Sequence, residues 1–246
     1  MYNRRETLLE IILPIFTQYF EKFKVEEIYN FKINYEIYRN KEIFSYDESE
    51  ELIGSKNSFE ENVLLKKILS NKLSYEKNKV KYYNWIVKKW GKITKFEKPK
   101  STIKVFFDQI KKGEIKAEYY NNISSYSKIA SFRYPKEYFI YDSRVAYVLN
   151  WMLLKSKIKF LYFPIPEGRN NDLSKKYNMD TIISLFNNGE YMSKNVTYSV
   201  YCRLIKNINS KLNPLGDAFC IEMFLWGLFE NIVLEIKNSV KIKIEL

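Results

Sequence analysis

Histidine is absent from the 246-residue chain, and cysteine occurs only twice, as Cys202 and Cys220. Without an imidazole, the protein lacks the side chain most often used for acid–base catalysis near neutral pH and the commonest metal ligand. Two cysteines are too few to hold a zinc ion or an iron–sulfur cluster by themselves. We therefore expect no metal and no small-molecule cofactor, and we expect both cysteines to be reduced core residues of an intracellular protein.

Long apolar runs are lacking as well. The apolar run at 224–229, FLWGLF, is far shorter than the roughly 20 residues that span a bilayer. The N-terminal segment MYNRRETLLE has no apolar run of the kind found in signal peptides. We therefore expect a soluble, cytoplasmic protein that has no membrane partner.

Turn-forming residues are few, with 7 glycines and 6 prolines, and apolar residues recur at helical spacing instead. Val145, Val148, Leu149 and Met152, for example, follow the i, i+3, i+4, i+7 pattern. The same analysis predicts helices at 5–23, 58–73, 79–93, 102–114, 142–155, 179–188, 196–212 and 217–236. Because the pattern at 24–57 is ambiguous, a few short strands are compatible with it. The sequence thus predicts a mainly α protein.

Positive charge is what the chain has in excess. Lysine and arginine number 41 against 29 aspartates and glutamates, which gives a formal net charge of +12 at pH 7. Such an excess favours a polyanionic partner, with nucleic acid first and an anionic membrane second. A genome-wide preference for lysine would give the same charge without a function, so the charge alone does not decide between these readings.

A lysine and an aspartate stand near the starts of two successive predicted helices. The stretch SSYSKIASF is typical of a short serine-capped helix and carries Lys128, and DSRVAYVL is typical of a helix capped by Asp142. The link between them, RYPKEYF, contains a proline and is too short to form a separate layer. We therefore expect the two helix starts to face one cleft. Taken singly, Asp142 reads as a helix cap and Lys128 as one of many solvated lysines.

This arrangement resembles the helix-hairpin-helix DNA glycosylase superfamily, in particular its 8-oxoguanine glycosylase-like branch. The segment ISSYSKIA (123–130) stands where the family has its hairpin and nucleophilic lysine. The segment FIYDSRVAYVL (139–149) stands where the family has its catalytic aspartate followed by a helix. The matching covers about thirty residues and implies that Lys128 and Asp142 are the catalytic residues. It also implies a single helical unit, 1–246, with two lobes, 1–120 and 121–246.

The resemblance implies that the enzyme flips a nucleotide out of the duplex and cleaves its glycosidic bond. The carboxylate of Asp142 would stabilise the positive charge that builds on the sugar. The amine of Lys128 would attack C1′ and form a Schiff base, which allows strand cleavage as a lyase. If Lys128 points away, Asp142 would instead activate water, and the enzyme would be monofunctional.

Two further groups of side chains complete the predicted site. Donors near the two helix starts are expected to bind DNA phosphates: Ser124, Ser125, Ser127, Arg133 and Arg144. Ser125 and Ser127 stand near the places of the hairpin glycines of the family. A base pocket is expected from aromatic, apolar and polar side chains: Trp85, Phe106, Arg169, Met223 and Trp226. At helical spacing the apolar members of this set are more typical of a core than of a pocket, and Arg169 is more typical of a solvent loop.

The sequence therefore predicts a DNA glycosylase that excises a damaged or modified base, with an oxidised purine favoured, from double-stranded DNA. The alternative is a basic helical protein that binds DNA or RNA without chemistry. A nuclease is disfavoured, because no compact set of carboxylates with metal-ligand spacing stands out. The sequence gives no indication of the oligomeric state.

Overall fold

The computed structural model describes residues 7–98, 100–158, 161–167, 177–187, 189–212 and 216–240. It is mainly helical, which confirms the prediction of a mainly α protein. Within these residues the only β-type pairing is an isolated bridge between Tyr162 and Tyr191. The ambiguous stretch 24–57 contains no strand and instead forms three short helices: α2 (Val25–Ile28), η1 (Tyr35–Arg39) and α3 (Tyr46–Ile53).

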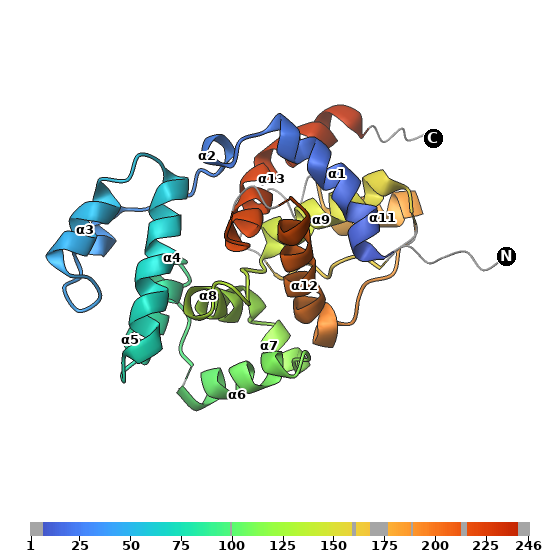
Figure 1. The fold of residues 1–246 in the computed structure, drawn as a ribbon. Coiled ribbons are helices and arrows are strands. Elements are labelled where there is room, and N and C mark those ends of the chain that lie inside the picture. The colour runs from blue at the N-terminus through green and yellow to red at the C-terminus, as the bar shows by residue number, and fades with distance from the viewer. Residues whose placement is uncertain are drawn as a thin grey trace.

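The middle of the chain forms a central lobe, defined here as η1 to α8 (Figure 1). After η1 and α3 it comprises α4 (Ser58–Tyr75), α5 (Val80–Asn84), η2 (Trp85–Trp90), α6 (Lys100–Lys111), α7 (Ala117–Tyr120) and α8 (Ile123–Arg133). Helix α8 packs against α4 and η2 on one side and against α6 and α7 on another. The predicted helix 79–93 thus becomes α5 followed by a π-helical stretch, η2, which ends before Gly91.

Helix α1 and the helices after α8 form a terminal lobe, in which the N-terminal helix lies among the C-terminal ones (Figure 1). Its members are α1 (Leu8–Lys22), α9 (Ser143–Ser156), α11 (Met179–Asn187), α12 (Lys194–Leu212) and α13 (Phe219–Ser239). Helix α1 packs on α9 and α12, and α13 packs on α9. The observed packing differs from lobes 1–120 and 121–246, since α1 joins the second half of the chain and α8 joins the first.

Several of the helices begin directly after a side chain that accepts hydrogen bonds from the backbone N–H groups of the first turn. Thr7 and Glu10 form a reciprocal capping box at α1, and Ser45 and Glu48 form another at α3. Asp142 caps α9 without a reciprocal partner, because its side chain accepts hydrogen bonds from the backbone N–H groups of Arg144 and Val145. Local sequence thereby fixes where these helices begin, and the apolar faces then decide what they pack against.

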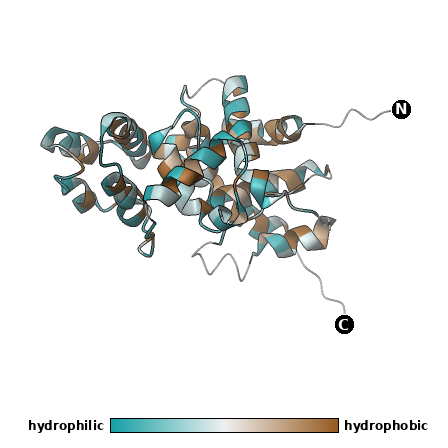
Figure 2. Ribbon diagram, turned by 90° about the horizontal axis from the view of Figure 1, so that it is seen from below, coloured by the Kyte–Doolittle hydropathy of each residue, from teal (hydrophilic) through white to brown (hydrophobic). Residues whose placement is uncertain are grey.

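Apolar and polar residues alternate along most of the helices, as Figure 2 shows in brown and teal. This pattern is typical of amphipathic helices that share a core. Cys202 and Cys220 are buried free thiols, as predicted, and burial raises the pKa of each to about 12. In the part of the chain that the structure describes, no helix combines the length and the apolar character needed to cross a membrane.

Helix α13 approaches α2 closely at Gly227. A Cβ atom at this position would lie 3.0 Å from the backbone of Ile28 and from Cα of Tyr29. Backbone atoms cannot rotate away as a side chain can, so we expect Gly227→Ala to lower the free energy of unfolding by about 1–3 kcal/mol. The steric cost at this contact would thus exceed the gain in helix propensity on replacing glycine by alanine, which is at most about 1 kcal/mol.

Denaturant unfolding of the two chains measures this difference. The control is Leu234→Ala on the same helix, because Leu234 is exposed and its truncation should change stability by only about 0.5 kcal/mol or less. A Gly227→Ala variant as stable as the wild type would show that the two backbones can separate without cost.

Candidate active site at the junction of helices α8 and α9

Asp142 is the residue immediately before α9, and its side chain is fixed by the first turn of that helix. Its Oδ1 atom accepts hydrogen bonds from the backbone N–H groups of Arg144, at 3.1 Å, and Val145, at 3.2 Å. The other carboxylate oxygen, Oδ2, accepts no hydrogen bond from the described residues. The side chain is partly buried at the positive end of the helix dipole. The junction therefore holds a carboxylate of fixed orientation that retains an oxygen for another group.

Lys128 lies in the middle of α8, and its residue is only 8% exposed. Its Nζ donates a hydrogen bond to the backbone oxygen of Ser124, at 2.9 Å. Its aliphatic stem runs beside the end of η2, where a Cβ on Gly91 would lie 3.0 Å from Cδ of Lys128. Lys128 is thus an interior side chain between two helices and not a solvated lysine.

A pair of hydrogen bonds joins the two helices directly beside these residues. The backbone N–H of Tyr141 donates to Oγ of Ser127 at 3.0 Å, and this hydroxyl can donate to the carbonyl of Tyr141 at 3.3 Å. Ser127 precedes Lys128, and Tyr141 precedes Asp142. The structure therefore joins the middle of α8 to the segment that leads into α9.

A buried ion pair ties both lobes together at the same junction. Nζ of Lys66, on α4, lies 2.9 Å from Oε2 of Glu222, on α13, and the two side chains are 1% and 2% exposed. Lys66 also donates to the hydroxyl of Ser131, on α8. The backbone N–H of Ile140 bonds the Glu222 carboxylate. Helices α4, α8 and α13 and the segment before Asp142 are therefore connected through one network, the Lys66 network.

Burial raises the pKa of Glu222 above its ordinary value, and the negative charge of Asp142 adds to this effect. The ammonium group of Lys66 acts in the opposite direction and favours the charged carboxylate. Sequence analysis missed the partner of Glu222. Lys66 shares a helical stripe with Leu69 and Leu73, both fully buried, and this spacing indicates that the lysine is buried but not which group it meets.

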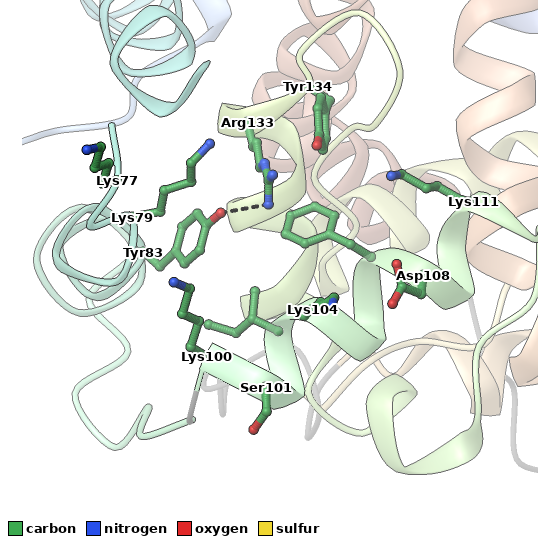
Figure 3. A pocket seen from close by; sticks show the side chains of 12 residues that line it. Lys77, Lys79, Tyr83, Lys100, Ser101, Lys104, Asp108, Lys111, Arg133 and Tyr134 are labelled. Carbon is green, nitrogen blue, oxygen red and sulfur yellow. Dashed lines mark hydrogen bonds between the residues drawn. The ribbon is translucent and has the colours of Figure 1, made fainter. Parts of the chain in front are cut away.

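The predicted phosphate-binding residues do not form one surface. Ser125 and Ser127 are buried, and the hydroxyl of Ser127 is engaged with Tyr141. Ser124 is partly buried, and its carbonyl accepts the hydrogen bond from Lys128 described above. Arg133 lies at the C-terminal end of α8, where it faces a pocket lined by lysines (Figure 3).

The predicted base-pocket residues lie in separate places. Trp85 packs against Phe44 in the central lobe, with ring centroids 5.0 Å apart, and Phe106 stacks on Tyr126 at 4.8 Å. Met223 is fully buried in α13. A role in the core accounts for these three positions. Arg169 lies outside the described residues.

Trp226 belongs to an aromatic cluster that sequence analysis did not identify. Phe31 lies between Trp90 and Trp226, with centroid distances of 4.9 and 5.3 Å, and Tyr29 contacts Trp226 at 5.2 Å. The guanidinium of Arg144 lies 4.4 Å from the centre of the Trp226 ring. Phe31 and Trp226 are only partly buried. Aromatic rings from both lobes therefore gather beside the start of α9.

Among the described residues, no group of three or more histidines, cysteines, aspartates or glutamates is arranged to hold a metal ion. Comparison with protein-family models, curated proteins and solved structures finds no match to this chain.

Proposed function

We propose that the protein is a cytoplasmic DNA glycosylase that excises a damaged or modified base, with an oxidised purine favoured, from double-stranded DNA. The observation that carries the proposal is the carboxylate of Asp142, held at a helix start and joined through the Ser127–Tyr141 hydrogen bonds to the helix that bears Lys128. The net charge of +12 favours a polyanionic substrate.

In the proposed reaction, the sugar of a flipped nucleotide lies against Asp142. As the bond from C1′ to the base breaks, positive charge builds on the sugar, and Oδ2 of Asp142 stabilises it. The electron pair of that bond leaves with the base, which takes up a proton. The partly buried rings of Phe31 and Trp226 offer stacking surfaces of the kind that flipped bases require.

Lys128 would supply the second step. Its neutral amine, once released from the carbonyl of Ser124, attacks C1′ of the sugar cation and loses a proton. The C1′–O4′ bond then breaks, O4′ takes up a proton, and C1′ and the nitrogen form the iminium of a Schiff base. An aldehyde-derived imine of this kind permits cleavage of the strand on the 3′ side of the sugar. A base that leaves without this attack would be replaced by water that Asp142 activates, and the enzyme would then be monofunctional.

The direct test is a panel of duplexes, each with one modified or oxidised base, scored for abasic sites against an unmodified duplex of the same sequence. We expect abasic sites in at least one modified duplex and none in the unmodified one. Duplexes that all stay intact while the protein binds them would instead support the non-catalytic alternative.

Borohydride trapping tests the role of Lys128. We expect the wild type to form a covalent complex with the reactive duplex and Lys128→Ala to form none, because the proposal makes Lys128 the amine that attacks C1′. The matched control is Lys136→Ala, which removes an exposed lysine from the link between α8 and α9 and should leave trapping unchanged. Base excision without any trapping by the wild type would assign the chemistry to Asp142 alone.

A specific observation favours the non-catalytic alternative, a basic helical DNA- or RNA-binding protein. The ammonium group of Lys128 is buried and hydrogen-bonded to its own helix, as a structural lysine would be. Such a protein would show affinity that falls with salt and no chemistry on any duplex.

A further inference from the structure

A second candidate site lies at the C-terminal end of α8, where α5, α6 and the end of α8 line a pocket of about 500 Å³ (Figure 3). We call it the basic pocket. Its one acidic residue is Asp108. Its cationic side chains are Lys77, Lys79, Lys100, Lys104, Lys111 and Arg133. Six positively charged side chains and one negatively charged side chain therefore line the same pocket.

Within the described part of the chain, no carboxylate balances these charges. None of the six cations forms an ion pair with a carboxylate among the residues that the structure describes. Burial lowers the pKa of Lys79, and the positive charges of Arg133 and Lys100 lower it further. Mutual repulsion of this kind is relieved when an anion binds.

Arg133 is held in place at the wall of the basic pocket. Its Nη1 donates to the hydroxyl of Tyr83 at 2.9 Å, and its guanidinium lies 4.7 Å from the ring centre of Phe107 and 4.9 Å from that of Tyr134. In Figure 3 the side chains of Lys79, Lys100 and Arg133 surround the Tyr83 ring. The described residues accept no other hydrogen bond from this guanidinium. A fixed guanidinium with unused N–H groups suits a phosphate oxygen pair.

We propose that the basic pocket binds a small ligand with two or more adjacent phosphate groups, such as a nucleoside triphosphate or inorganic tripolyphosphate. One phosphate group would bind the guanidinium of Arg133, and the lysine ammonium groups would neutralise the other phosphate groups. The volume falls in the range of small-ligand sites, and the concave lining from three elements suits a compact ligand better than a duplex. The inference does not depend on the proposed glycosylase activity, because it uses neither Lys128 nor Asp142.

Calorimetric titration of the full chain tests this proposal with tripolyphosphate and a nucleoside triphosphate as probes. The variant is Lys100→Gln with Lys104→Gln, since both side chains are exposed and their removal should leave the fold intact. We expect binding of either probe to weaken at least about tenfold, from the loss of charge-assisted contacts. The control is Lys211→Gln with Lys237→Gln, which removes the same charge from exposed positions of the terminal lobe.

Tighter binding of the nucleoside triphosphate than of tripolyphosphate would show that the base is also recognised, and equal binding would show recognition of the phosphates alone. Both results support the proposal. If binding weakens equally in the control variant, the effect comes from net charge alone, and the proposal of a specific site is wrong. Absence of binding by both probes, with weaker duplex binding in Lys100→Gln, Lys104→Gln, would overturn it in favour of a nucleic-acid surface.

Discussion

Asp142→Asn is expected to lower the single-turnover rate of base excision by about 10²- to 10³-fold while leaving the fold and the affinity for DNA nearly unchanged. Asparagine is as good a helix cap as aspartate, and its side-chain oxygen can accept the same N–H groups of Arg144 and Val145. The substitution therefore removes the charge that faces the sugar without removing the cap. This separates the catalytic role from the structural one.

The measurement pairs excision rates with unfolding curves and DNA-binding curves for the same protein. Asp47→Asn is the matched control, because Asp47 is an exposed aspartate in the first turn of α3 and should have no effect on the rate. An Asp142→Asn variant that excises the reactive base as fast as the wild type would remove Asp142 from the chemistry and with it the proposed mechanism.

Lys66→Met is expected to lower the free energy of unfolding by about 3–5 kcal/mol, because it leaves the Glu222 carboxylate buried without its partner. The double variant Lys66→Met, Glu222→Leu should recover most of this loss, since it removes both charges and keeps similar volume. Denaturant unfolding of the wild type, the single variant and the double variant measures the coupling. A double variant no more stable than the single one would show that the charge of Glu222 is not the cause.

The stability of the Lys66→Met variant should change with pH in a defined direction. Without Lys66, burial keeps the pKa of Glu222 above its value in the unfolded chain, so the folded state binds a proton more readily than the unfolded state. The stability of the variant should therefore fall as pH rises above the ordinary carboxyl pKa. Its deficit against the wild type should be smaller at low pH than at neutral pH. A deficit independent of pH would point to lost packing instead.

Local features of the sequence predicted much of the helical structure. The spacing of apolar residues in 58–73 and 142–155 anticipates α4 and α9 to within about two residues at each end, the usual uncertainty of such boundaries. The cap at Asp142 was also predicted, because a capping aspartate acts through its own first turn. These features depend on neighbours within a few residues along the chain.

Long-range pairings could not be predicted in this way. Lys66 and Glu222 are 156 residues apart, and nothing in the spacing of either helix indicates that they meet. Helical periodicity shows that Trp85 and Phe106 are buried, but it does not show which rings they face. The gathering of Phe31 and Trp90 with Trp226 arises from the meeting of two lobes, so it appears only in three dimensions.

The chain passes from the terminal lobe into the central lobe after α1 and returns to the terminal lobe at α9, so it crosses between the lobes twice. A body tethered at two points has fewer ways to move than one on a single linker, and here the Lys66 network adds a third attachment close to the return crossing. Large opening and closing of the two lobes would have to break that interior bond. A long polyanion bound across both lobes would therefore have to bend, because the two lobes cannot readily move relative to each other.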